Sequence, residues 1–246
     1  MLERIWEAGP YAVDYLPGRG ADLVIAFASV GHDPARPPAP EFIASASGRG
    51  TAAHPRPALF VSDESRSWAN APGFEAALEG SLARLRARQE VARIATLGLS
   101  MGAFAALVAA QVIPVDLVLA FGPQYSIAPG GVPGETRWAE WTARIAPLRW
   151  PVAPLPALAQ AWLFHGGVDD LPHALRFEAH PGSEQIIFPA QSHASLVPHL
   201  KNRGALSGLI EAARAGDRRR LLRIAASAGG ARRAKLFPPG AAAIPR

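Results

Sequence analysis

The sequence of 246 residues contains no cysteine, which excludes disulfide bonds, thiolate metal sites and a cysteine nucleophile. It also lacks an apolar run near the roughly 18 residues that a membrane-spanning helix needs, because Gln111 and Pro114 interrupt the longest one. The opening stretch, MLERIWEAGP, does not have the basic and then apolar layout of a signal peptide. We therefore expect a cytoplasmic protein without an integral membrane segment.

Lysine is scarce as well, since Lys201 and Lys235 stand against 23 arginines, which fits a GC-rich bacterial genome. The net charge of +5 is concentrated in residues 217–246, which hold eight Arg or Lys and one acid. This segment therefore carries +7 and the remaining 216 residues carry −2. Its one aromatic residue, Phe237, provides no interleaved stacking pattern, so we expect no nucleic-acid partner.

Composition also predicts the domain organisation. With 49% hydrophobic and 18% charged residues in the chain, we expect residues 1–216 to form one globular domain and 217–246 to form a basic tail. Beyond about residue 228, little apolar surface remains to offset an ordering entropy of roughly 1–2 kcal/mol per residue. We therefore predict that the end of the tail is mobile and lies outside the core.

Short apolar runs alternate with stretches of helical spacing along the rest of the chain. This alternation predicts an α/β fold with a mostly parallel sheet covered by helices on both faces. A ligand site is then expected at the carboxyl ends of the strands. The predicted strands lie at 11–16, 22–30, 58–62, 94–97, 115–121, 161–164 and 185–188, and the predicted helices at 74–89, 103–110 and 196–213.

The most specific signal is the stretch RIATLGLSMGAFAALVAA at 93–110. A short apolar run precedes GLSMG at 98–102, and a run of helix formers follows it. The order of strand, sharp turn and helix makes this G-x-S-x-G pattern a candidate nucleophile elbow with Ser100 at the turn. Side chains at the two glycine positions would collide with the neighbouring strand and helix, and free N–H groups at the helix N-terminus can stabilise an oxyanion.

A serine at an elbow needs a carboxylate and a histidine that follow it in the chain. FHGGVDD at 164–170 follows a buried strand, and its spacing favours Asp169 as the acid, with Asp170 as the alternative. His193 stands between the last predicted strand and the closing helix, which is the place expected for the base. His165 is expected to brace the turn rather than to react.

Residues 127–160 differ from the rest of the chain because they are rich in proline and tryptophan. Trp138, Trp141 and Ile145 recur at the spacing of one face of a short helix. One interpretation is a lid-like insertion in which Trp138 and Trp141 line a substrate pocket. The other is an insertion that only packs its tryptophans on the body of the protein.

Together, GLSMG, HGGVD at 165–169 and the pair Ser192-His193 resemble the α/β-hydrolase-fold superfamily of serine hydrolases, over roughly residues 10–213. The resemblance implies Ser100 as the nucleophile, His193 as the general base and Asp169 as the acid that orients it.

The same resemblance places the backbone N–H of Met101 in an oxyanion hole, with a second donor at Ala28 or Ser29. The chain departs from the family pattern here, because no His-Gly pair follows the strand predicted at 22–30. Asp63 with Trp68, the segment FGPQYS at 121–126 and the stretch 193–196 are also similar to hydrolase-like proteins that accompany bacterial surface-polysaccharide synthesis.

These features predict a serine esterase or acyl hydrolase that forms an acyl-enzyme and requires no metal or organic cofactor. The expected substrate is a small acyl ester or an acylated saccharide. An acyltransferase with a sugar or alcohol acceptor would use the same triad. A third possibility is a catalytically silent hydrolase-fold binding partner in surface-polysaccharide synthesis. The sequence leaves the oligomeric state open.

Overall fold

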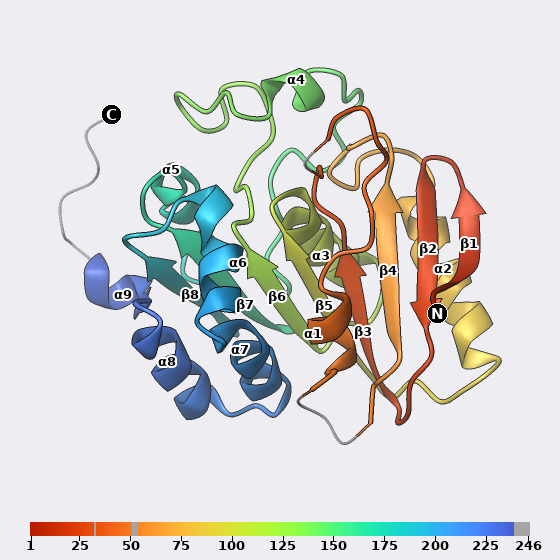
Figure 1. Ribbon diagram of the computed structural model, residues 1–246. Coiled ribbons are helices and arrows are strands. Elements are labelled where there is room, and N and C mark those ends of the chain that lie inside the picture. Colours follow the sequence, from red (N-terminus) through yellow and green to blue (C-terminus); the bar gives the residue numbers. More distant parts are fainter. Residues whose placement is uncertain (32, 51–53, 239–246) are drawn as a thin grey trace.

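The computed structural model describes residues 1–31, 33–50 and 54–238, which form one sheet of nine strands with helices on both faces (Figure 1). The strands are β1 (Glu3–Ala8), β2 (Tyr11–Leu16), β3 (Asp22–Phe27), β4 (Ala58–Asp63), β5 (Arg93–Leu99), β6 (Leu117–Phe121), β7 (Gln160–Gly166), β8 (Ser183–Phe188) and β9 (Ala231–Arg232). The helices are α1 (Ile43–Ser47), α2 (Phe74–Arg86), α3 (Met101–Val112), α4 (Ala139–Thr142), α5 (Leu171–Ala174), α6 (His193–Asn202), α7 (Ala205–Arg214), α8 (Arg218–Ser227) and α9 (Arg233–Leu236).

The strand order in the sheet is β1-β2-β4-β3-β5-β6-β7-β8-β9. The pairs from β4 to β8 are all parallel, whereas β1, β2 and β9 add antiparallel edges. The central strands are nearly continuous apolar runs because both of their faces are covered. The predicted α/β architecture with a mostly parallel sheet is confirmed.

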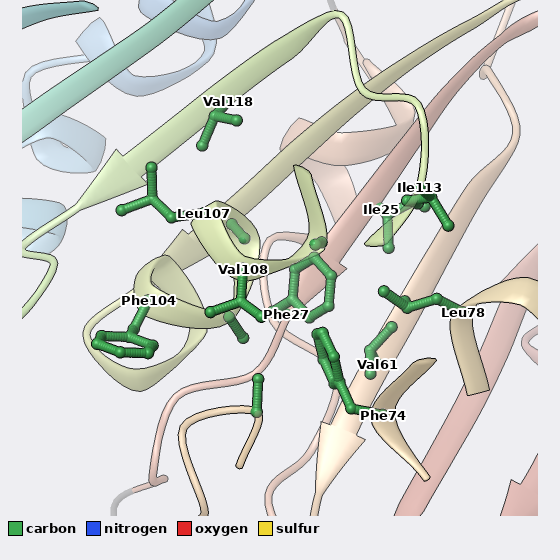
Figure 2. Close-up of a cluster of buried hydrophobic side chains, with 14 of the residues drawn as sticks. Ile25, Phe27, Val61, Phe74, Leu78, Phe104, Leu107, Val108, Ile113 and Val118 are labelled. Carbon is green, nitrogen blue, oxygen red and sulfur yellow. The ribbon is translucent and has the colours of Figure 1, made fainter. Parts of the chain in front are cut away.

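Each face of the sheet has its own hydrophobic core. On one face, α2 and α3 pack against the strands, and Figure 2 shows Phe27 and Val61 of the sheet facing Phe74 and Leu78 of α2. On the other face, α1, α6, α7 and α8 cover the sheet through side chains such as Leu209, which is fully buried. The helices thus fix the strands whose carboxyl ends carry the site.

The helix predicted at 196–213 is two helices, α6 and α7. Gly204 separates them in a left-handed conformation, with φ of 66°. The first of the two begins earlier than predicted, because Ser192 forms a capping box with Ser195 and thereby makes His193 the first helical residue. His193 is therefore held on the first turn of a helix rather than in a free loop.

The described residues from 228 to 238 contact the body of the protein, whereas the sequence predicted that they lie outside the core. Ala231 and Arg232 pair with β8 as the antiparallel edge strand β9. The Ala228 carbonyl lies 2.8 Å from Nε2 of His199, and Arg233 donates to the Leu175 carbonyl at 2.9 Å. Backbone pairing and arginine hydrogen bonds order this segment without large apolar side chains. The last eight positions of the predicted mobile tail, 239–246, lie outside the described residues.

The segment between β6 and β7, which contains the predicted insertion 127–160, has little regular structure apart from α4. Figure 1 shows it beyond the carboxyl ends of the strands, above the rest of the molecule. A single bridge between Ser126 and Val152 closes it at its base. None of the helices in the described part of the chain is both long and apolar enough to cross a membrane.

Candidate active site

Ser100 stands between β5 and α3 with φ of 56° and ψ of −122°. A non-glycine residue with positive φ outside the left-handed helical region is strained, and such strain is often found at functional sites. The side chain is nearly fully buried, with 3% of the residue exposed. Two hydrogen bonds join the turn to α3: the Ser100 carbonyl accepts from the backbone N–H groups of Ala103 and Phe104.

The two glycines of the motif allow this turn for steric reasons. A Cβ at Gly98 would lie 2.2 Å from the Gly102 carbonyl carbon, and a Cβ at Gly102 would lie 2.2 Å from the Phe27 carbonyl oxygen. Both distances are far shorter than a van der Waals contact. The sequence GLSMG therefore brings β5, α3 and β3 together closely enough to place Ser100 at the carboxyl edge of the sheet.

The His193 ring is held by Asp170 and not by Asp169. Its Nδ1 lies 3.1 Å from Oδ1 and 3.0 Å from Oδ2 of Asp170. Asp169 instead accepts a hydrogen bond from the backbone N–H of His193, with its Oδ1 at 2.6 Å. The prediction that Asp169 is the partner of the ring is therefore corrected. The path of the loop after β7 brings the carboxylate of Asp170, and not that of Asp169, to the imidazole.

Burial and charge both act on Asp170, of which 2% is exposed. Burial alone would raise its pKa, but the hydrogen bond and charge of His193, with further contributions from His165 and Arg137, hold the pKa below its usual value. Asp170 is therefore a carboxylate at neutral pH. An ionised acceptor at Nδ1 leaves the proton on that nitrogen and the Nε2 atom free to act as a base.

Among the described residues, no hydrogen bond joins Ser100 to His193, although both lie next to the end of β6. The Ser100 N–H donates to the Phe121 carbonyl at 2.9 Å. A Cβ at Gly122 would lie 2.9 Å from Nδ1 of His193 and 3.3 Å from Oδ2 of Asp170. The backbone of Ser100 and the ring of His193 thus lie near two consecutive residues, Phe121 and Gly122. Catalytic hydrogen bonds are often long without substrate and shorten when it binds.

The Ser100 hydroxyl does have a partner that sequence reasoning missed. Nε2 of Gln124 donates to Oγ of Ser100 at 2.9 Å, and Nε1 of Trp68 donates to Oε1 of Gln124 at 3.0 Å. Both Gln124 and Trp68 are buried. Each residue of the chain Trp68–Gln124–Ser100 comes from the end of a different strand, so no local pattern could have linked them.

The predicted insertion contributes charged groups to the acid side of the site. Arg137 lies 3.1 Å from Asp170 and 3.3 Å from Asp169, and it also pairs with Glu135. Glu135 in turn lies 2.9 Å from Nε2 of His173.

The ring of His173 has its other nitrogen, Nδ1, 2.9 Å from the Tyr125 backbone N–H, which can only donate. The ring is therefore neutral, with its proton on Nε2 and directed at Glu135. Burial lowers the pKa of His173 against the opposing influence of Glu135.

Of the backbone N–H groups expected in an oxyanion hole, one is already engaged in a hydrogen bond within the protein. Met101 is the first residue of α3, so its N–H has no acceptor within the helix. The N–H of Ala28 is already bound to the Val61 carbonyl at 2.9 Å, which removes Ala28 as a free donor. The Ser29 hydroxyl donates to Glu41 at 2.6 Å and accepts from the Gly31 N–H at 3.2 Å, so this side chain anchors the loop after β3.

Trp138 and Trp141 both pack against the hydrophobic core that α2 and α3 form on one face of the sheet, but their polar neighbours differ. The Trp138 ring lies edge-on to His193, with centroids 5.0 Å apart, and lines a cavity of about 270 Å³ within the insertion. Trp141 lies under the guanidinium of Arg66, which is 4.5 Å from its ring centroid. The helix α4 spans only four residues, although backbone hydrogen bonds of helical type continue from Trp138 to Ile145.

His165 is completely buried on β7 and does not brace the turn by hydrogen bonding. The Pro123 carbonyl lies close, but neither ring nitrogen has a partner with hydrogen-bond geometry among the described residues. Burial lowers the pKa of His165 to about 4, so the ring is neutral at pH 7. Elsewhere in the described part of the chain, no three His, Asp or Glu side chains are grouped as metal ligands.

Comparison with known proteins shows the fold. No protein-family model matches the sequence, and no curated protein does. Among solved structures, the acylaminoacyl peptidase of Pyrococcus horikoshii superposes with a TM-score of 0.55 at 14% identity, over 86% of this chain and 40% of the peptidase. This chain thus spans less than half of the length of that protein.

Two other solved structures are of similar size to this chain. The capsule O-acetyltransferase of Neisseria meningitidis serogroup A has a TM-score of 0.55 at 10% identity, over 80% of this chain and 90% of that protein. A Pyrococcus furiosus esterase has a TM-score of 0.55 at 11% identity, over 81% and 85%. The chain has the α/β-hydrolase fold.

Proposed function

We propose that this α/β-hydrolase-fold chain is a serine hydrolase that cleaves an ester or related acyl bond through Ser100, His193 and Asp170. The observation that carries the proposal is the strained elbow conformation of Ser100, together with a histidine near the end of the adjacent strand β6 whose Nδ1 faces a buried carboxylate. A serine held only for packing would not require an energetically costly backbone conformation.

The reaction follows from these groups. His193 Nε2 takes the Ser100 proton while Oγ attacks the acyl carbon, and the carbonyl π electrons move to the carbonyl oxygen. Asp170 stabilises the resulting imidazolium. Collapse of the intermediate breaks the bond to the alcohol, which leaves with the proton from His193. Water then attacks the acyl-enzyme in the same way and releases the carboxylic acid and Ser100.

The negative oxygen of the intermediate requires donors, and one of them in this proposal is the Met101 N–H, which has no acceptor within α3. Removal of one such donor typically costs roughly 3–4 kcal/mol in the transition state. The Ser29 N–H is the second backbone donor that we propose, since Ala28 is already bonded.

We also propose that the insertion binds part of the substrate. The cavity lies against His193 through Trp138, and its wall includes Ile127, Val132, Thr142 and Ala143. The apolar side chains suit an uncharged acyl or alcohol group, and the carboxylate of Glu135, which also lines the cavity, disfavours an anionic one. In this view Trp138 is a pocket residue, whereas Trp141 holds the insertion to Arg66.

An acyltransferase is the second candidate, because the fold likeness extends over 90% of an O-acetyltransferase. It would resolve the same acyl-enzyme with a sugar or alcohol hydroxyl in place of water. A catalytically silent binding partner in surface-polysaccharide synthesis is a third candidate, and the three filled positions of the triad argue against it.

The test is covalent labelling with a fluorophosphonate together with turnover of p-nitrophenyl acetate. We expect the native protein to be labelled and active, Ser100→Ala to lose both properties, and Ser227→Ala, an exposed serine elsewhere, to keep both. Addition of glycerol or a simple sugar separates the candidates, because a transferase forms the acetylated acceptor faster than free acetate. Absence of labelling in the folded native protein would support the silent partner.

A further inference from the structure

The hydroxyl oxygen of Ser100 accepts a hydrogen bond from a neighbouring side chain, that of Gln124. Gln124 stands three residues after β6, with 1% of its surface exposed, and its Nε2 lies 2.9 Å from Oγ of Ser100. A buried amide normally has its donors and acceptor satisfied. Here one N–H of the Gln124 amide donates to Oγ of Ser100, the atom that would attack the substrate.

The orientation of this amide is determined by its other partner. The indole N–H of Trp68 can only donate, and it lies 3.0 Å from Oε1 of Gln124. The oxygen of Gln124 therefore faces Trp68, and its NH₂ group faces Ser100. Because Oγ of Ser100 accepts from Gln124, its own proton must point elsewhere and is available to His193.

The loop after β4 is built to hold Trp68 in this position. Arg66, Trp68 and Ala69 have φ of 51°, 51° and 62°, so three non-glycine residues within four positions are left-handed. Each costs of order 1–3 kcal/mol and persists only where its surroundings enforce it.

The enforcing contacts are hydrogen bonds to buried side chains. Asp63 accepts from the backbone N–H groups of Ser65 and Ser67 at 3.0 and 2.8 Å, and from both of their hydroxyls. The Asn70 amide donates to the Trp68 carbonyl at 3.0 Å. The strained residues of this loop and the hydrogen bonds that hold them thus lie at or next to Trp68, which orients Gln124.

We propose that Gln124 is a catalytic residue that donates a hydrogen bond to the nucleophilic oxygen, and that Trp68 is the positioning residue that fixes its amide. The proposal rests on the proposed function, since it requires Ser100 to be the nucleophile. When His193 takes the Ser100 proton, negative charge grows on Oγ before the bond to the acyl carbon is complete. The bond from Gln124 then becomes charge-assisted and about twice as strong. It therefore stabilises the transition state more than the ground state.

The first experiment removes the donor. Gln124→Met keeps the length of the side chain without an N–H group. We expect kcat to fall about 100-fold, the lower end of the loss for a deleted oxyanion-hole donor, with KM nearly unchanged. Should this variant fail to fold, Gln124→Glu keeps the shape and still accepts from Trp68, and we expect it to lose kcat as well. A folded variant with native kcat overturns the proposal.

The second experiment tests whether Trp68 acts through Gln124. Trp68→Phe removes the indole N–H and keeps an aromatic ring, and we expect a loss in kcat that is smaller than that of Gln124→Met. The double variant is expected to be no slower than Gln124→Met alone, since residues in one hydrogen-bond chain are not additive. Multiplicative losses would show that Trp68 affects activity by another route and would overturn its assignment.

Trp162→Phe is the matched control, because Trp162 is also buried and its indole nitrogen has no hydrogen-bond partner among the described residues. It should leave kcat unchanged. The thermal midpoint of each variant separates loss of fold from loss of rate. If the native protein is neither labelled nor active, the proposed function fails. If it is active and Gln124→Met matches it, only this inference fails.

Discussion

Asp169 and Asp170 are consecutive in the chain, yet they hold two different parts of His193. Asp169 accepts from the backbone N–H at 2.6 Å, and Asp170 faces the ring at 3.0 Å. Asp169 thereby stabilises the start of α6, where a negative charge is favourable. In the proposed reaction, Asp170 sets the tautomer of His193 as the base.

Amide substitutions separate these two roles. Asp170→Asn is expected to lower kcat by roughly 10⁴-fold, as loss of the orienting carboxylate does in serine proteases, because the ring adopts the wrong tautomer. Asp169→Asn keeps an oxygen acceptor for the backbone N–H and should cost far less. Steady-state kinetics with p-nitrophenyl acetate measures both, and the reverse ranking would return the role to Asp169.

Gly122 leaves room for the side chains of His193 and Asp170. Gly122→Ala places a methyl group 2.9 Å from Nδ1 of His193 and also incurs the strain of φ at 56°. Gly216→Ala incurs the same kind of strain, at φ of 66°, with no atom within 4 Å. Both should lose about 1–2 kcal/mol of stability, but only Gly122→Ala should lose activity. Equal activities in the two variants would contradict the role given to Gly122.

Arg137 links the insertion to the acid of the site, and its effect on stability should depend on pH. Burial raises the pKa of Asp170, and His193, His165 and Arg137 together lower it below its usual value. A lowered carboxylate pKa contributes stability above the pKa of the unfolded chain, about 3.9, and this contribution is lost as the pH falls through the folded value.

Arg137→Met should therefore be less stable than the native protein at pH 7, and the deficit should shrink as the pH falls below about 4. Urea unfolding at pH 7 and pH 3 measures this difference. Arg144→Met is the control, because Arg144 lies at the surface, where it pairs with Glu140 at 3.5 Å and lies over the Trp141 ring without contact to Asp170. A deficit for Arg137→Met that is the same at both pH values would indicate lost packing rather than lost charge.

His165 should give the stability a second dependence on pH. This one arises from the burial of a neutral histidine and not from the ion pairing of a carboxylate. Its pKa in the folded protein is about 4 because of burial, against about 6.5 in an unfolded chain. The unfolded state binds more protons between these values, so stability falls as the pH drops from about 6.5 to 4, by roughly 3 kcal/mol in total. In His165→Gln this slope should be reduced, whereas His54→Gln, at an exposed position, should keep it. An unchanged slope in His165→Gln would contradict the assignment.

The docked tail predicts a loss of stability on truncation. A chain that ends at Ser227 lacks β9 and the Arg233 hydrogen bonds, and we expect its thermal midpoint to fall by several degrees, since about 1 kcal/mol shifts the midpoint of a domain of this size by roughly 2–4 °C. A chain that ends at Pro238 keeps these contacts and serves as the reference. Equal midpoints would restore the prediction of a tail outside the core.

The sheet could be predicted from the sequence because its central strands are short apolar runs at regular intervals. The strand β1 was missed for the opposite reason: only Ile5 is buried in it, so its sequence does not alternate as a half-buried strand does. The edge strand β9 is held by pairing with β8 at two positions, and its sequence has no hydrophobic pattern from which a strand could be predicted.

The site was predictable in part for similar reasons. Ser100 lies in a local pattern whose glycines have a steric cause, and His193 follows from its place in the order. The choice between Asp169 and Asp170 depends on the path of one loop, which spacing does not determine. Gln124 and Trp68 are 56 residues apart in the chain. They meet because the loops after β4 and β6 reach across the ends of β3 and β5, which separate these strands in the sheet.

The two residue pairs that β9 forms with β8 also bear on how the protein behaves at high concentration. An uncovered strand at the rim of a sheet can recruit a strand from another molecule and start aggregation. β9 covers β8 at Ile186 and Ile187, and Arg218 and Arg232 bring positive charge to Glu184 at the same rim. The segment that contains β9 thus covers the apolar part of β8 at this edge and places charge there, which leaves less of β8 open to pairing with another molecule.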